Sequence, residues 1–164
     1  MASKSRSKLE QELYKPVRDF LHSKFAAKFG NCYLDITAKG HFEETLKRAV
    51  HHDIIFAFLG RKASPDLAGF IKDEFGIKDF VTVEVKLDKI TLQDIYQAKL
   101  YGDLFAAKYA LLISPLPTPE EVKRLHQNLF ILYRFTSGWQ VYIGQWREEF
   151  QEVAENSWFP EPPF

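Results

Sequence analysis

The sequence predicts an α/β sandwich, in which helices flank a central mixed β-sheet and the elements follow the order α-βββ-α-β-α-ββ. Three patterns support this class: helical spacing of apolar residues near the N-terminus, short β-like runs in the middle, and alternating helix and strand patterns afterwards. The chain has 164 residues, of which 46% are hydrophobic and 27% charged. This length and composition favour a soluble globular protein with one core over a disordered chain.

A first helix is expected over residues 8–29. Its apolar residues recur at helical spacing, and Gly30 is a suitable C-terminal stop. The residues of this apolar stripe are Leu9, Leu13, Val17, Phe20, Leu21 and Phe25. Pro16 lies within the pattern, so we expect either a bend there or a helix that begins near Lys15.

A β-meander is expected in the middle of the chain. Three β-like runs follow one another, separated by turn residues. They are His52–Leu59, Leu67–Ile71 and Phe80–Leu87. Before them, residues 31–48 show a weaker pattern, which is compatible with a short strand over Tyr33–Thr37 followed by a helical turn.

Helix and strand patterns alternate in the C-terminal half. A second helix is expected over Thr91–Lys108, largely buried because it is rich in Leu, Ile, Ala and Phe, and a strand over Tyr109–Ile113 follows it. Thr118, Pro119 and Glu121 match the start of a third helix, with Thr as the N-cap and Pro at the first helical position. A closing hairpin is predicted over Phe130–Phe135 and Trp139–Trp146.

These elements indicate one domain over residues 1–150 and a tail over residues 151–164. The tail is rich in proline and aromatic residues, and two placements fit it: on its own domain, or on a second subunit of a homodimer. The longest apolar run, Ile54–Leu59, is far shorter than the roughly 20 residues of a membrane helix, and the N-terminus lacks a secretory pattern. We therefore expect a cytoplasmic protein without a membrane partner.

The chain lacks both the strong positive charge that indicates a nucleic-acid-binding protein and the paired cysteines of a disulfide or zinc site. The chain has 22 basic and 22 acidic residues, so its global charge does not by itself indicate a nucleic-acid-binding protein. The lone Cys32 has no partner for an internal disulfide or for a cysteine-based zinc site. We expect Cys32 to serve in packing.

The third strand of the meander carries an acid and a base on one face. Its valines alternate with polar residues, so Glu84 and Lys86 point together away from the valine face. Asp66 opens the preceding strand, and a hairpin would bring its carboxylate beside that of Glu84. Two carboxylates form a site that Mg²⁺ accepts, and Lys86 adds a fixed positive charge. This combination suits metal-assisted hydrolysis of a phosphodiester.

Pro65-Asp66 followed by Glu84-Val85-Lys86 resembles the PD-(D/E)xK nuclease superfamily, which has the restriction-endonuclease-like fold. The resemblance implies that Asp66 and Glu84 bind a Mg²⁺ or Mn²⁺ cofactor and that Lys86 is catalytic. It also implies a nuclease that acts on nucleic acid, with DNA as the commoner substrate in the family. The sequence contains no helix-turn-helix or zinc-finger pattern, so base-specific recognition is not indicated.

Two helices supply further candidate residues. Gln97 and Tyr101 resemble the QxxxY motif of the RecB-like branch of the superfamily, and at i and i+4 they share one helix face. The resemblance implies that they orient the site or contact nucleic acid. Many members also use an acidic residue of the first helix, a role for which Glu10 and Glu12 compete. Because Glu10 falls within the apolar stripe and Glu12 points away from it, we expect Glu10 to join the catalytic residues.

Weaker features surround this site. Arg61 and Lys62 are candidates for phosphate contact, although a basic turn is commonly only a solvated turn. His51 and His52 would point to opposite faces of a strand, which argues against joint metal binding. In the simplest alternative, Glu84 and Lys86 form only a solvated ion pair.

Two other functions compete with a nuclease. One is a catalytically silent module with the same fold that binds nucleic acid or serves in assembly. The other is the hydrolysis of a small phosphate ester by the same metal and residues.

Overall fold

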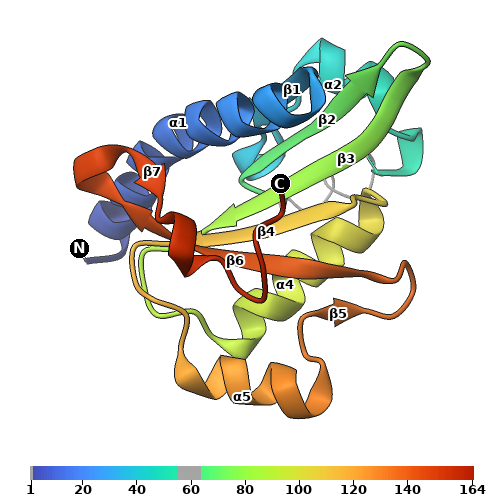
Figure 1. The fold of residues 1–164 in the computed structure, drawn as a ribbon. Helices are drawn as coiled ribbons and strands as arrows, with labels where there is room; N and C mark the ends of the chain where they lie inside the picture. Colours follow the sequence, from blue (N-terminus) through green and yellow to red (C-terminus); the bar gives the residue numbers. More distant parts are fainter. Residues whose placement is uncertain (1, 55–63) are drawn as a thin grey trace.

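The computed structural model describes residues 2–54 and 64–164, which form an α/β fold with an open, mixed sheet of seven strands (Figure 1). Six of the strands follow the order β1-β2-β3-β4-β6-β5, and the seventh, β7, pairs with β6. The strands are β1 Asn31–Ile36, β2 Leu67–Asp73, β3 Gly76–Val85, β4 Tyr109–Ser114, β5 Tyr133–Arg134, β6 Trp139–Arg147 and β7 Glu152–Val153. The α-helices of the described residues are α1 Ala2–Phe29, α2 Glu44–Ala49, α4 Leu92–Leu104 and α5 Glu120–Leu129. Three short 3-10 helices cover Ala38–Gly40, Glu148–Phe150 and Glu155–Ser157.

Helix α1 covers one face of the sheet (Figure 1). Of the expected stripe, Val17, Leu21 and Phe25 are fully buried, as the helical spacing predicts, whereas Leu9 at its N-terminal end is 51% exposed. The buried part of this stripe packs in one core cluster with the valines of β3 at positions 81, 83 and 85. Pro16 lies inside the helix, and α1 begins well before it, so the expected alternative of a start near Lys15 is wrong.

Helices α4 and α5 lie on the opposite face of the sheet (Figure 1). A capping box begins α4. The Asp94 backbone N–H donates to the Thr91 hydroxyl, and the Thr91 backbone N–H donates to the Asp94 carboxylate. Period-2 alternation along β3 turns Thr82 and Glu84 toward this second face. The sheet therefore separates an apolar α1 side from an α4 side that carries polar groups.

The predicted meander is present, but its first strand differs from the expected one. Strands β1, β2 and β3 pair antiparallel in that order, with β1 at Asn31–Ile36 as the weaker pattern over Tyr33–Thr37 indicated. The run His52–Leu59 is not the first strand, because residues 52–54 are helical. Residues 55–59 of that run lie outside the described part of the chain.

Two expectations about helices are wrong. Helix α5 has Pro119 as its N-cap, in an extended conformation, and the side chain of Thr118 makes no capping hydrogen bond. Thr118 is instead buried, and its hydroxyl has no hydrogen-bond partner among the described residues. Helix α4 is also less buried than its composition suggests, because Leu92, Tyr96 and Leu100 are 45%, 55% and 54% exposed.

The C-terminal tail packs on its own domain. A β-bridge joins Phe159 to Ile143 of β6, and Trp158 is buried in the same cluster as the α1 stripe. The ring centroid of Phe164 lies 5.4 Å from that of Phe25 and 5.5 Å from that of Trp158. The aromatic residues of the tail therefore complete the core on the α1 side.

Across residues 2–54 and 64–164, no helix has both the length and the apolar character that a membrane crossing requires.

Gly69 allows the close approach of β1 to β2. A Cβ at this position would overlap with the backbone carbonyl oxygen of Tyr33 and lie 2.8 Å from the Cα of Leu34. We expect Gly69→Ala to lower the free energy of unfolding by about 1–3 kcal/mol, because backbone atoms must move apart. Urea denaturation measures this change, and an unaltered midpoint would contradict the close strand contact.

Candidate active site

The register of the central strands brings Asp66 and Glu84 together. Strands β2 and β3 pair antiparallel with Leu67 opposite Val83. Continuing this register by one residue sets Asp66, which directly precedes β2, opposite Glu84. Because Glu84 is also paired with Leu112 of β4, it lies inside the sheet with a neighbouring strand on its other side.

The segment before β2 is tied to the end of β1. The Thr37 hydroxyl donates to the Pro65 carbonyl at 2.7 Å, and the Thr37 backbone N–H donates to the Asp66 carbonyl at 2.9 Å. The Ser64 hydroxyl donates in return to the Thr37 carbonyl. These bonds hold the backbone of Asp66 in place although it lies outside the strand.

The two carboxylates are buried and partly hydrogen-bonded. Asp66 is 8% exposed and Glu84 is 2% exposed. The Val85 backbone N–H donates to Asp66 Oδ2 at 2.8 Å, and the Asp66 backbone N–H donates to the Glu84 carboxylate. Glu84 Oε1 is buried without a hydrogen-bond partner among the described residues. The pair therefore keeps unused acceptor capacity in a site almost closed to bulk water.

Lys86 places its ammonium beside this pair. Its Nζ lies 3.3 Å from Glu84 Oε2 and 3.8 Å from Asp94 Oδ1, and it donates to Gln97 Oε1 at 3.2 Å. An ammonium has three N–H donors; Gln97 and Glu84 lie within hydrogen-bond distance of it, whereas Asp94 contributes an ionic attraction at longer range. The side chain remains 21% exposed, which leaves one side of the lysine open to solvent.

Gln97 and Tyr101 act on the same lysine from α4. The Gln97 Nε2 donates to the Tyr101 hydroxyl at 3.3 Å, which orients the amide so that its oxygen accepts from Lys86. Tyr101 is buried, with 5% of its surface exposed. In this arrangement the two residues hold the lysine in position, which agrees with an orienting role rather than with contact to nucleic acid.

Glu10 reaches the site through Tyr14. The Tyr14 hydroxyl donates to Glu10 Oε1 at 3.2 Å and also hydrogen-bonds with Asp66. Glu12 is exposed and lines a surface groove with residues such as Lys15 and Glu148. Of the two competing acids, only Glu10 is connected to the carboxylate pair.

Burial controls the protonation of the two acids. Desolvation raises the pKa of Asp66 to about 6, although the hydrogen bond from Val85 opposes the shift. Desolvation, followed by the charge of Asp66, raises the pKa of Glu84 well above its ordinary value. Burial alone would lower the pKa of Lys86, but the Glu84 and Asp66 carboxylates raise it above its ordinary value. Both acids therefore hold a proton more readily than exposed carboxyl groups do, while the lysine stays charged.

A small hard cation fits this donor set. The unpartnered Glu84 Oε1 is an oxygen that such an ion can bind, and an added positive charge would favour the ionised form of both acids. Across residues 2–54 and 64–164 no three His, Cys, Asp or Glu side chains are grouped to hold an ion. Two carboxylates suffice for Mg²⁺, since it commonly takes one or two protein carboxylates and keeps several waters.

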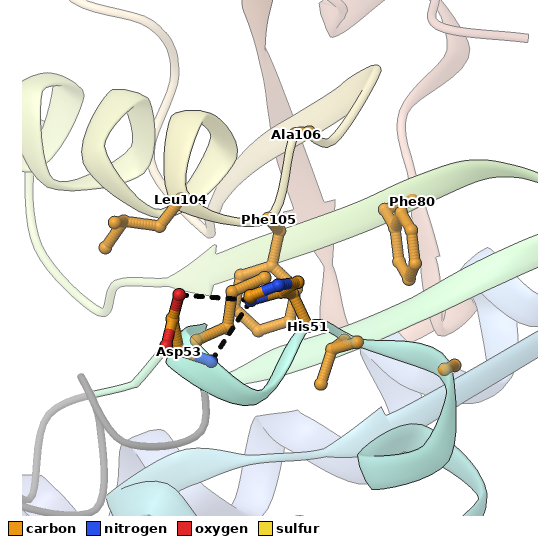
Figure 2. A pocket seen from close by; sticks show the side chains of 9 residues that line it. His51, Asp53, Phe80, Leu104, Phe105 and Ala106 are labelled. Atoms are coloured by element: carbon orange, nitrogen blue, oxygen red, sulfur yellow. Dashed lines mark hydrogen bonds and ion pairs between the residues drawn. The ribbon is translucent and has the colours of Figure 1, made fainter.

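The histidine pair lies elsewhere, and within the described parts of the chain it belongs to no group of three or more potential metal ligands. The argument from strand alternation does not apply, because residues 52–54 are helical. His51 Nδ1 lies 3.3 Å from Asp53 Oδ2, at one side of an apolar pocket that Phe80 and Phe105 help to line (Figure 2). Arg61 and Lys62, the candidates for phosphate contact, lie outside the described residues.

Two contributors to the site were not expected from the sequence. Tyr14 falls one helical turn after Glu10, on the buried face of α1, where an aromatic residue is indistinguishable from a core residue. Asp94 lies three positions before Gln97, near the same helix face, and three positions after Thr91 as a potential capping residue, but neither spacing assigns it a contact with Lys86. Helical spacing relative to Glu10 and to Gln97 could have identified these two residues as neighbours of the site. Their contacts with Asp66 and Lys86 depend on tertiary packing, which spacing does not specify.

Comparisons with protein-family models, with curated proteins and with solved structures found no match to this chain. The chemistry of the site therefore has to be inferred from its own geometry.

The raised pKa of Asp66 predicts a pH-dependent stability. Because about 6 lies above the ordinary value of 3.8, the folded protein binds this proton more tightly than the unfolded chain does. The contribution is complete below about pH 4 and is lost as the pH rises through about 6. We expect metal-free protein to lose on the order of 3 kcal/mol over this range through Asp66.

Urea denaturation in the presence of a chelator, at several pH values between 4 and 7.5, measures this loss. Asp66→Asn cannot ionise at this position, so its stability should fall less over the same range. Parallel pH profiles for the two proteins would contradict the raised pKa.

Proposed function

We propose that this chain is a Mg²⁺- or Mn²⁺-dependent nuclease of the PD-(D/E)xK type, in the RecB-like branch, with a restriction-endonuclease-like fold. Its substrate would be nucleic acid, with DNA favoured because it is the commoner substrate of the resembled family. The observation that carries the proposal is the buried carboxylate pair Asp66 and Glu84, incompletely hydrogen-bonded and 3.3 Å from the Lys86 ammonium at its nearest oxygen.

A purely structural role does not account for this arrangement. Burying a carboxylate is costly unless its charge is paired and its oxygens are hydrogen-bonded, and one oxygen of Glu84 has no partner among the described residues. A solvated ion pair is also inconsistent with a Glu84 side chain that is 3% exposed. Groups that lower stability in this way are typical of functional sites.

The roles of the residues follow from their contacts. Asp66 and Glu84 would hold the divalent ion, which when bound polarises a phosphoryl oxygen and acidifies a bound water. Lys86, with its ammonium kept charged by the two acids, is positioned to stabilise negative charge on the phosphate or to orient the attacking water. Gln97 fixes the lysine, and Tyr101 fixes the amide of Gln97.

Substitution of the site should separate catalysis from folding. We expect Glu84→Gln and Lys86→Ala each to lower metal-dependent cleavage of DNA by about 100-fold or more, since the first removes a ligand of the divalent ion and the second removes the positive charge beside the phosphate. Glu84→Gln should keep or raise the free energy of unfolding at neutral pH, because an amide replaces a carboxyl group whose ionisation is unfavourable in this buried site. Cleavage of linear, circular, branched and single-stranded substrates, together with urea denaturation, measures both effects.

Lys89→Ala is the matched control for the lysine. Lys89 forms a surface ion pair with Glu121 and its side chain is 61% exposed, so its removal should leave cleavage unchanged. Wild-type cleavage equal to that of both site variants would refute the assignment. Retained binding of nucleic acid without cleavage or metal binding would favour the silent module, and activity on nucleotides but not on polymers would favour the small phosphate ester.

Binding of a divalent ion should stabilise the folded protein. At a free Mn²⁺ concentration 100 times the dissociation constant, the expected gain is about 3 kcal/mol, because the ion binds the folded state alone. The gain should grow as the pH rises through about 6, since carboxylate ligands bind metal in their deprotonated form.

Thermal unfolding with Mn²⁺, with Mg²⁺ and with a chelator measures this effect. Asp66→Asn should abolish most of the shift. An equal metal-induced shift in wild type and Asp66→Asn would indicate that the ion binds elsewhere.

A further inference from the structure

Tyr14 connects the first helix to the carboxylate pair. Its hydroxyl donates to Glu10 Oε1 at 3.2 Å and also hydrogen-bonds with Asp66. The residue is 6% exposed and packs in the same core cluster as the α1 stripe. The hydrogen bonds of Tyr14 therefore join helix α1 to the residue that directly precedes β2.

The chemistry of a phenol limits what this bridge can do. A hydroxyl carries one proton, so Tyr14 can donate to one of the two carboxylates at a time. Asp66 receives its other hydrogen bond from the Val85 backbone N–H. When the Tyr14 proton is directed at Asp66 instead of Glu10, the Asp66 carboxyl group has a donor on each side, and this arrangement limits its rotation away from the position opposite Glu84.

We propose that Tyr14 is a positioning residue that orients Asp66 for the divalent ion and through which Glu10 acts on the site. The inference rests on the proposed function, because it concerns the same metal ligands. Tyr14 itself touches neither the ion nor the substrate in this proposal. Mutation of a group that orients a metal ligand typically lowers metal affinity or activity 10- to 100-fold.

The packing of Tyr14 can be separated from its hydrogen bonds. Tyr14→Phe retains the ring that fills the α1 core and removes only the hydroxyl. Tyr109→Phe is the matched control, because Tyr109 is a buried tyrosine of the same cluster whose ring packs against Phe25 and Phe29. Both variants should fold, as thermal unfolding in a chelator will verify.

The first experiment measures Mn²⁺ binding to the full chain by isothermal titration calorimetry, without substrate. We expect Tyr14→Phe to bind Mn²⁺ about 10- to 100-fold more weakly than wild type, and Tyr109→Phe to bind as wild type does. Metal binding by Tyr14→Phe at wild-type affinity would overturn the inference and leave the proposed function intact. Absence of Mn²⁺ binding and of cleavage by wild type would instead refute the proposed function, and the inference with it.

A double-mutant cycle tests the path from Glu10. If Glu10 acts through Tyr14, the affinity loss in Glu10→Gln combined with Tyr14→Phe should equal the loss in Tyr14→Phe alone. If the two losses add, Glu10 reaches the ion independently, and the second half of the inference is wrong. The cycle also remains informative if Tyr14→Phe changes stability, because each comparison is made on proteins whose folded fraction is measured.

Discussion

The structure depends on the register between β2 and β3. With Leu67 opposite Val83, the valines of β3 face the fully buried stripe of α1, and Glu84 faces α4. Since side chains alternate along a strand, a shift of one residue would turn Glu84 into the α1 core and turn a valine toward the polar groups on the α4 side. The hydrophobic packing of α1 and the meeting of Asp66 with Glu84 are thus consequences of the same strand pairing.

This register also explains how the fold tolerates a destabilising site. A buried charge without its partner costs several kcal/mol, which is a large part of the roughly 5–15 kcal/mol that stabilises a domain. Glu84 is held on both sides by paired strands, and Asp66 is held by bonds to the end of β1 and to Val85. The backbone therefore keeps the two acids together against their mutual repulsion, which side-chain contacts alone would not achieve.

Local patterns in the sequence predicted the elements whose periodicity is unambiguous, but not those with two equally good interpretations. The alternation along β3 placed Glu84 and Lys86 on one face, and the stripe of α1 separated Glu10 from Glu12. The run His52–Leu59, which is continuously apolar only from Ile54, fits a strand and a buried helix equally, so its first residues were assigned wrongly. The contact of Lys86 with Gln97 and the bridge through Tyr14 depend on how helices pack against the sheet, which spacing within one element does not specify.

The charges of the site would explain why a chain with a net charge of zero can still attract a nucleic acid. Two buried carboxylates oppose one ammonium, and Asp94 and Glu10 add further negative charge nearby. With its acids ionised and no cation bound, such a site repels a phosphodiester, whatever the number of basic residues on the distant surface. A divalent ion would reverse the local sign, since the ion is then the largest charge present. Attraction of the substrate would accordingly depend on the loaded site more than on the net charge, which is why a chain with balanced charge is compatible with nuclease chemistry.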